Sequence, residues 1–409
     1  MKTYPTNEIK NVVLLGASGS GKTTLAEAMA FDGKVIDRRG SIETDSTLSD
    51  YTDIEHIYKR SIYPTLLFAE YNGYKLNIID TPGADDFCGG LFSAFKVADV
   101  GVMLINAQNG FEVGSEIQAR YARSHDKPII AVINQLDSEK ASWEASLDSI
   151  RAASQVTPVV VQYPVNPGPD FNAFIDVLLK MYKFKGDTGI REELDIPAEE
   201  MERATELNRI LTEAAAENDE ALMELYFEKG VLTQDELRSG LKLGLAKRDL
   251  IPVFCASGKR DIGAKRLMEF IINVAPGPLK APNFVTVDGR EIEPDSNGPT
   301  ALFVFKTTVE PHLGEVTYFR VISGKVTEGM ELVNSKTGNK EKISQLFAVA
   351  GKNRVKVTEM MAGDIGCTVK LKGTRTNQTL STPGSNIEID PIRFPEPRYR
   401  VAVKAVKTG

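Results

Sequence analysis

From residue 11 to about residue 137, short apolar runs alternate with stretches in which apolar positions recur at helical spacing. Four of these runs have the length and composition of buried strands, at residues 11–15, 76–79, 100–105 and 129–133. A fifth run at residues 251–254 precedes a helical pattern at residues 265–274. Alternation of this kind predicts an α/β domain with a mostly parallel sheet and helices on both of its faces.

The pattern changes between the fourth and the fifth run. Residues 158–165 are β-rich, whereas residues 197–246 have a helical pattern and are rich in Glu, Ala and Leu. Because this stretch separates two strands of one predicted sheet, we expect a subdomain at about residues 158–250, inserted into a first domain at residues 1–278.

The second half of the chain is organised differently. Residues 275–299 are dense in Pro, Gly and Asp, and we interpret residues 279–299 as a linker. Short strand-like runs then follow at residues 301–308, 316–323, 331–334, 341–347 and 364–370. This spacing predicts a small all-β barrel domain at residues 300–392. Residues 393–409 hold no element that could bury a core, so we expect them to be the truncated start of a further domain.

Composition and charge restrict the class of protein. With 42% apolar and 26% charged residues the chain is globular in composition, and its formal net charge of -7 argues against a broad basic face. We therefore expect no direct sequence-specific binding to nucleic acid. Cys88, Cys255 and Cys367 are far apart and lack metal-ligand spacing, as is usual in a reducing compartment. Without an apolar signal core or membrane-length run, we expect a cytoplasmic monomer with no membrane partner.

The strongest chemical signal lies between the first apolar run and the first helical pattern. The spacing G-x-x-x-x-G-K-T is that of a phosphate-binding loop, whose backbone N–H groups surround phosphates at a helix N-terminus. Lys22 is placed to reach the β- and γ-phosphates, and the Thr23 hydroxyl to bind the Mg²⁺ that bridges them. The flanking pattern disfavours the alternative, a Gly- and Ser-rich turn that opens an ordinary helix. The predicted loop comprises Gly16, Ala17, Ser18, Gly19, Ser20, Gly21, Lys22, Thr23 and Thr24.

A second motif, Asp80, Thr81, Pro82 and Gly83, follows the run at residues 76–79. Asp80 therefore leaves the carboxyl end of a strand, where ligands of open α/β sheets bind, and we expect it to hold Mg²⁺ through bound water. No side chain obstructs the N–H of Gly83, which can donate to a γ-phosphate. On its own this tetrapeptide is also a common turn sequence, so its meaning depends on the phosphate-binding loop upstream.

A third motif, Asn-Gln-Leu-Asp, follows the run at residues 129–133, and a Cys-Ala-Ser turn follows the fifth run. The carboxylate of Asp137 can accept hydrogen bonds from two donors of guanine, whereas adenine presents an acceptor at that edge. This predicts GTP rather than ATP, although the tetrapeptide alone also fits an ordinary turn. We expect backbone N–H groups of the Cys-Ala-Ser turn to donate to the guanine oxygen. The predicted base pocket comprises Asn134, Gln135, Asp137, Cys255, Ala256 and Ser257.

In this order the motifs resemble those of the translational GTPases, and most specifically elongation factor G. The resemblance covers nearly the whole chain and implies a P-loop GTPase domain with an inserted subdomain, a β-barrel second domain and the start of a third. It also implies a factor that binds GTP or GDP with Mg²⁺ and acts on the ribosome in translocation of tRNA and mRNA. The later domains of the family are missing, so we expect nucleotide binding without translocation. Outside the nucleotide site the resemblance rests on Phe305-Lys306-Thr307, Pro311-His312-Leu313-Gly314, Tyr318-Phe319-Arg320-Val321, Ala362-Gly363-Asp364-Ile365 and Phe394-Pro395-Glu396-Pro397.

Two departures from the family pattern concern catalysis. The family histidine that follows D-T-P-G and positions the attacking water is replaced by Ala84. Loss of such a group is worth about 10² to 10⁴ in rate. The family R-G-I-T-I segment, whose threonine closes over Mg²⁺ and the γ-phosphate, is also absent. Counting back from Asp80 places Ser61 at that threonine position, with Thr65 as a poorer alternative.

Two further departures concern binding. Ala17 and Gly19 stand where the family commonly has His and Asp, and Gln135 replaces a lysine whose stem covers the base. We expect Lys22, Ser61 and Gly83 to take part in GTP hydrolysis. Because of Ala84, we expect this hydrolysis to be weak or strictly dependent on the ribosome. One alternative is a hydrolysis-deficient, GTP-controlled ribosome-binding module. Another, an ATP-dependent P-loop kinase or transporter ATPase, leaves Asp137 and the barrel unexplained.

Overall fold

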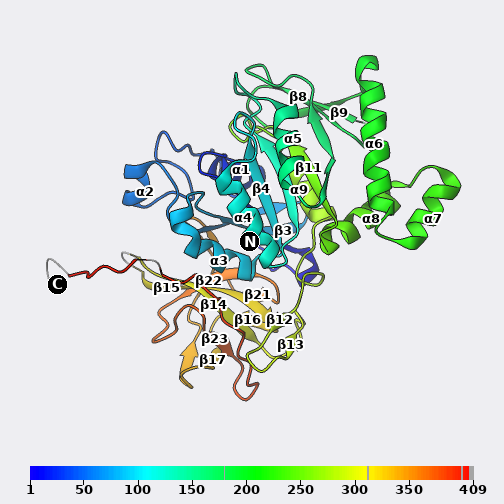
Figure 1. The fold of residues 1–409 in the computed structure, drawn as a ribbon. Helices are drawn as coiled ribbons and strands as arrows, with labels where there is room; N and C mark the ends of the chain where they lie inside the picture. The colour runs from blue at the N-terminus through cyan, green and yellow to red at the C-terminus, as the bar shows by residue number, and fades with distance from the viewer. Residues whose placement is uncertain (179, 311–312, 398, 405–409) are drawn as a thin grey trace.

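The computed structural model describes residues 1–178, 180–310, 313–397 and 399–404 (Figure 1). Its first part contains a central sheet with the strand order β2-β3-β1-β4-β5-β11-β6. Every neighbouring pair in this sheet is parallel except β2 and β3. The strands are β1 (Ile9–Leu15), β2 (Thr65–Tyr71), β3 (Tyr74–Asp80), β4 (Val100–Asn106), β5 (Ile129–Asn134), β6 (Thr157–Val160) and β11 (Leu250–Cys255).

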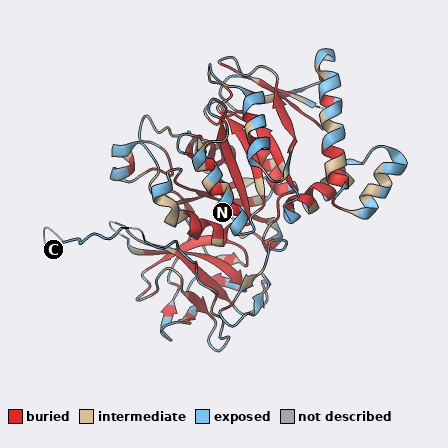
Figure 2. Cartoon of the chain, in the orientation of Figure 1, coloured by how far each residue is buried: buried red, intermediate tan, exposed pale blue. Residues whose placement is uncertain are grey.

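Helices cover both faces of the central sheet. Its central strands β1 and β4 are buried along their whole length, which explains their nearly continuous apolar sequences (Figure 2). Helix α1 (Lys22–Asp32) leads from β1 towards β2 and β3 and packs against α9 (Ala264–Asn273). The connections through α3 (Cys88–Val97), α4 (Val113–Ser124) and α5 (Trp143–Ala153) run the other way along the sheet. Right-handed crossovers therefore place these three helices on the opposite face.

Strand β2 forms an antiparallel edge hairpin with β3, which the apolar pattern did not predict. The turn between them consists of Asn72 and Gly73, with φ values of 45° and 85°. Both residues are in the left-handed region, as a two-residue type I′ turn requires, and Asn-Gly is the commonest sequence for it. The Asn-Gly pair in the sequence therefore indicates this hairpin, although the apolar pattern does not.

The stretch between β6 and β11 forms a separate layer that projects from the central sheet (Figure 1, green). It contains an antiparallel sheet with the order β10-β9-β8-β7, followed by three helices. Strand β6 lies in the range expected for the insertion but pairs with β11 of the central sheet. The expected domain boundaries remain predictions. The elements are β7 (Gln162–Pro164), β8 (Ala173–Asp176), β9 (Lys180–Phe184), β10 (Arg191–Leu194), α6 (Met201–Ala216), α7 (Glu220–Lys229) and α8 (Gln234–Lys247).

The second domain is built from antiparallel strands, so the predicted order of an α/β domain and an all-β domain is confirmed. Its main sheet has the order β18-β17-β23-β14-β15-β22-β19-β20, and β16 pairs with β21. A short hairpin, β12 (Phe284–Val285) with β13 (Glu291–Ile292), lies in the expected linker. Pro311 and His312, which contributed to the family resemblance, and residues 405–409 lie outside the described residues. The strands are β14 (Ala301–Glu310), β15 (Gly314–Ser323), β16 (Lys325–Thr327), β17 (Glu331–Asn334), β18 (Lys340–Lys342), β19 (Leu346–Ala350), β20 (Asn353–Val357), β21 (Glu359–Met361), β22 (Ile365–Val369) and β23 (Thr379–Ser381).

Buried polar side chains join the two domains. The Lys75 ammonium on β3 lies 2.6 Å from the Asp364 carboxylate, and the two side chains are 0% and 6% exposed. The amide of Asn77 donates to the same carboxylate at 3.0 Å. A buried charge is tolerated only when it is paired and hydrogen-bonded, so this contact fixes the position of the second domain beside β3.

A second ion pair extends this network. Arg320 on β15 donates to the Asp99 carboxylate at 2.7 Å, and both side chains are almost fully buried. Asn11 on β1 donates to the other oxygen of Asp99 at 2.9 Å and accepts from Asn77 at 2.9 Å. The two ion pairs are therefore connected through two asparagine amides.

Replacing Lys75 by Met should strongly destabilise the protein, because Asp364 is left as an uncompensated buried charge. We expect the free energy of unfolding in urea to fall by about 3 to 5 kcal/mol. Lys356→Met is the matched control, because Lys356 pairs with Glu328 at the surface, and it should change the free energy by less than about 1 kcal/mol. Equal effects of the two substitutions would contradict a structural role for the buried pair.

Candidate functional site

The phosphate-binding loop connects β1 to α1 through glycines with left-handed backbone. Gly16 and Gly21 have φ values of 132° and 89°, which L side chains rarely adopt. A Cβ atom at Gly21 would lie 2.4 Å from the side-chain nitrogen of Asn134, and one at Gly16 would lie 2.3 Å from the carbonyl oxygen of Leu104. Close packing therefore requires glycine at both ends of the loop.

Lys22 points back into this loop. Its ammonium donates to the carbonyl oxygens of Gly16 at 2.7 Å and Ala17 at 2.9 Å. Burial lowers the pKa of Lys22 to about 8, and the nearby carboxylate of Asp80 opposes that shift. A Cβ atom at Gly83 would meet the Lys22 nitrogen at 2.5 Å, so the D-T-P-G motif lies against the same end of the loop. Lys22 and Gly83, which are both predicted to contact the γ-phosphate, thus lie side by side.

A pair of hydroxyls and a carboxylate meet beside the start of α1. The Thr23 hydroxyl donates to Asp80 at 2.7 Å and lies 3.2 Å from the hydroxyl of Ser61. The Thr65 hydroxyl instead donates to the carbonyl oxygen of Ser49 at 3.1 Å. Of the two candidates for the family threonine, Ser61 is therefore the one that reaches the site.

Two buried carboxylates belong to the same region. Asp80 and Asp50 are 1% and 5% exposed, and within the described ranges Oδ1 of Asp80 and both carboxylate oxygens of Asp50 have no hydrogen-bond partner. Burial raises the pKa of Asp50 to about 7, and the neighbouring Asp80 adds to the shift. Mg²⁺ prefers oxygen ligands, and a cation here would neutralise buried negative charge. The residues present therefore fit Mg²⁺, and no sequence motif had pointed to Asp50.

At the base end, amide side chains join separate loops. Asn134 donates to the carbonyl oxygen of Ser20 at 2.9 Å and accepts the N–H of Gly258 at 3.0 Å. Gln135 donates to the carbonyl oxygen of Gly19 at 2.6 Å. Both side chains therefore brace the phosphate-binding loop, whereas Asp137 lines the open cavity.

The Cys-Ala-Ser turn after β11 is not placed as expected. The N–H of Ala256 donates to the Ile133 carbonyl at 2.9 Å, and the N–H of Ser257 donates to the Ile262 carbonyl at 3.0 Å. Cys255 is buried as well, and none of the three lines the cavity. The first N–H is engaged by the neighbouring strand β5, and the second by the backbone pair that closes the turn. Lys259, two residues after Ser257, lines the cavity instead.

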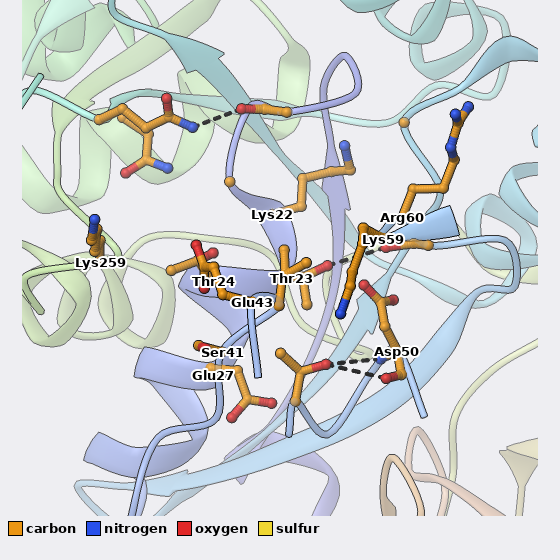
Figure 3. A pocket seen from close by; sticks show the side chains of 18 of the residues that line it. Lys22, Thr23, Thr24, Glu27, Ser41, Glu43, Asp50, Lys59, Arg60 and Lys259 are labelled. Carbon is orange, nitrogen blue, oxygen red and sulfur yellow. Dashed lines mark hydrogen bonds between the residues drawn. The ribbon is translucent and has the colours of Figure 1, made fainter. Parts of the chain in front are cut away.

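A cavity of about 730 Å³ connects the loop, the hydroxyl pair and the base end (Figure 3). Thr81 and Pro82 lie buried below it, and the Thr81 hydroxyl donates to the carbonyl oxygen of Leu14 at 2.6 Å. Ala84 lines a neighbouring cavity of about 490 Å³ together with Gly83 and Glu112. The predicted residues that line the first cavity are Ser18, Gly19, Gly21, Lys22, Thr23, Thr24, Ser61, Gly83, Asn134, Gln135 and Asp137.

The segment that carries Ser61 is anchored on α1. The carboxylate of Glu27, which is 1% exposed, accepts the N–H of Gly40 at 2.9 Å and also that of Leu48. The segment has one short helix, α2 (Asp53–Tyr58), between α1 and β2. A single carboxylate thus fixes two distant points of the cavity wall.

The second domain holds the other end of the same segment. The Lys306 ammonium on β14 donates to the carbonyl oxygen of Pro64 at 2.6 Å. The N–H of Gly351, after β19, donates to the carbonyl oxygen of Leu66 at 2.9 Å. The wall that carries Ser61 is therefore held by both domains.

A buried acid pair joins α1 to the loop after β11. Asp32 and Asp261 have no hydrogen-bond donor to their carboxylates within the described residues, and Lys265 lies 3.3 Å from Asp32. A Cβ atom at Gly189 would lie 2.5 Å from Asp261 and 3.3 Å from Asp32, so Gly189 covers the pair. Burial raises the pKa of Asp32 to about 7, and Asp261 raises it further. The pKa of Asp261 is also raised by burial.

The loop, the hydroxyl and carboxylate cluster and the carboxylate at the base end define a P-loop GTP-binding protein. Residues 7–277 match the family described as Elongation factor Tu GTP binding domain, and residues 299–383 match the one described as Elongation factor G domain 2. The chain belongs to the translational GTPases and is of the elongation factor G type. The resemblance inferred from the motifs is thereby confirmed.

The fold is similar to a solved structure. A crystal structure of a protein from Thermus thermophilus superposes with a TM-score of 0.84 at 28% sequence identity. The similarity covers 96% of this chain and 57% of that one, so the chain spans little more than half the length of this relative. Among the helices of the described chain, none is both long and apolar enough to cross a membrane.

The acid pair predicts a pH dependence of stability. The folded-state pKa of Asp32 is about 7, above the unfolded value of about 4. The stability that this carboxyl group contributes to the folded state is therefore present at low pH and is lost as the pH rises through 7. Asp261→Asn supplies a permanent amide donor, so it should raise the melting temperature at pH 8 and have less effect at pH 5.5. Asp148→Asn, at an exposed position, is the control. An equal change in melting temperature at both pH values would contradict ionisation of this acid pair as the cause of the pH dependence.

Proposed function

We propose that this chain binds GTP and GDP with Mg²⁺ and acts on the ribosome in translocation of tRNA and mRNA, as a cytoplasmic monomer. The observation that carries the nucleotide part is the meeting of Thr23, Ser61 and Asp80, which come from three separate segments. The ribosomal part is supported by membership of the family.

Each part of the nucleotide has a group to meet it. The loop amides and Lys22 would donate to phosphate oxygens, and the N–H of Gly83 would donate to the γ-phosphate. The hydroxyls of Thr23 and Ser61 would hold Mg²⁺, with Asp80 acting through water. When bound, the ion would neutralise charge that develops on the phosphates. At the other end, Asp137 would accept from the guanine edge.

A further question is how fast the bound GTP is hydrolysed. A methyl group at Ala84 cannot orient water, and the space beside it is open, with Glu112 on its wall. This favours GTP hydrolysis that is slow or strictly dependent on the ribosome. It also supports the second candidate, a GTP-controlled ribosome-binding module that does not hydrolyse. Single-turnover hydrolysis with saturating ribosomes separates them, because a rate at the uncatalysed background leaves only the module.

Asp137→Asn should remove the preference for guanine. The carboxylate loses its charge-assisted hydrogen bonds, so the dissociation constant for GTP should rise by about 10- to 10²-fold. Xanthosine triphosphate, whose oxygen can accept from the new amide, should bind better than it does to the unaltered protein. Glu139→Gln, exposed and two residues away, is the matched control. Calorimetry that finds the same GTP affinity in the Asp137 variant would argue against this base pocket.

Ala84→His should increase the rate of GTP hydrolysis, because it restores a side chain that can position water. We expect a gain of about 10²-fold or more in single-turnover rate with ribosomes. Ala84→Leu fills the same space without a polar atom and should give no gain. If both variants remain at the rate of the unaltered protein, slow hydrolysis has another cause than the missing imidazole.

A further inference from the structure

Arg60 lies on the wall of the nucleotide cavity, directly before Ser61. It lines the cavity together with Lys22, Ser61 and Gly83. In Figure 3 Lys259 and Arg60 lie on opposite sides of the view, with Lys22 between them. Arg60 thus belongs to the phosphate end rather than to the base end.

Arg60 is exposed, and its guanidinium has no hydrogen bond or ion pair with any residue of the described chain. Neighbouring cations of the cavity are engaged. The Lys59 ammonium lies 2.6 Å from Asp45, and the Arg39 guanidinium donates to three backbone carbonyls. Arg60 therefore differs from its neighbours in having its donors available to a ligand.

The position of Arg60 is set by its neighbour. Consecutive Cα atoms are about 3.8 Å apart, and the Ser61 hydroxyl lies 3.2 Å from that of Thr23. In P-loop GTPases the Mg²⁺ held at this threonine also contacts the γ-phosphate. A long side chain that starts beside Ser61 and enters the same cavity is consequently within reach of the γ-phosphate.

The backbone around Arg60 is held in place by Glu55. The N–H of Arg60 donates to the Glu55 carbonyl oxygen at 3.3 Å. The Glu55 carboxylate, which is 1% exposed, accepts the N–H groups of Ile62 at 3.1 Å and Tyr63 at 3.2 Å. Such fixed backbone means that Arg60 needs only a side-chain rotation to contact phosphate, which reduces the cost of ordering it.

We propose that Arg60 is a catalytic residue that stabilises the transition state of GTP hydrolysis from within the chain. The proposal rests on the GTPase function proposed above. Water adds to the γ-phosphorus as the bond to the β–γ bridging oxygen breaks, which yields GDP and inorganic phosphate, and the proton of the water passes to the phosphate. The Arg60 guanidinium donates to the γ-phosphoryl oxygens and the bridging oxygen while charge shifts between them.

This role fits the loss of the imidazole at Ala84. An arginine in this role neutralises charge and does not orient water, so it supplies a different part of catalysis. It also predicts that Arg60 contributes little to binding GDP, in which the γ-phosphate is absent. Ground-state and transition-state effects can therefore be separated experimentally.

The test compares Arg60→Ala and Arg60→Lys with the unaltered chain. Single-turnover hydrolysis with ribosomes should fall about 10³-fold in Arg60→Ala, and less in Arg60→Lys, which keeps the charge without the planar fork. Binding of fluorescent GDP should be unchanged, but the complex of GDP with aluminium fluoride, which mimics the transition state, should be lost in Arg60→Ala. Arg38→Ala, exposed and outside the cavity, is the control for charge and folding.

The outcomes separate this assignment from the proposed function. If the unaltered chain binds no GTP, the proposed function is wrong, and so is the catalytic role of Arg60. If it binds and hydrolyses GTP while Arg60→Ala matches it in rate and in the aluminium fluoride complex, only Arg60 is overturned. Weaker binding of GTP and GDP alike, without a change in rate, or binding without any hydrolysis on the ribosome, also overturns the catalytic role.

Discussion

The nucleotide site depends on how the segment between α1 and β2 is held. This segment has little regular structure, yet it carries Ser61 and forms one wall of the cavity. Glu27 on α1 accepts two of its N–H groups, and Lys306 of the second domain donates to the carbonyl of Pro64. Buried charges bonded to backbone in this way are expensive to release, because the charge would be left unpaired. The wall is therefore positioned before any nucleotide arrives.

The two domains are consequently parts of one site. The contact of Lys306 lies three residues from Ser61 along the chain, and the network around Asp364 fixes the second domain on the strand that ends at Asp80. In the proposed function, a γ-phosphate that binds near Ser61 would act on a segment that the second domain also holds. Coupling between two sites needs such a shared element, whose arrangement both sites influence.

The sequence was sufficient where function is carried by contiguous residues. The loop around Thr23 and the carboxylate of Asp80 follow from motif and strand order, and Ser61 followed from counting residues in the family pattern. Asp50 could not be found in this way, because its place beside the site depends on the path of an irregular segment. The N–H groups expected to be donors at Ala256 and Ser257 are instead engaged by strand β5 and by the turn itself. Local pairing of N–H groups is not visible in a tripeptide.

The departures from the family pattern act on different steps. The loop amides, Lys22 and the hydroxyls of Thr23 and Ser61 are in place for the proposed stabilisation of charge, and such electrostatic effects usually make the largest contribution to catalysis. In the function proposed above, orientation of water is the step that Ala84 would weaken. Under the same proposal a γ-phosphate would still be distinguished from its absence, because Gly83 and Ser61 would respond to its charge and not to its hydrolysis. The GTPase and the GTP-controlled module therefore share one binding site and differ only in how long the GTP-bound state lasts.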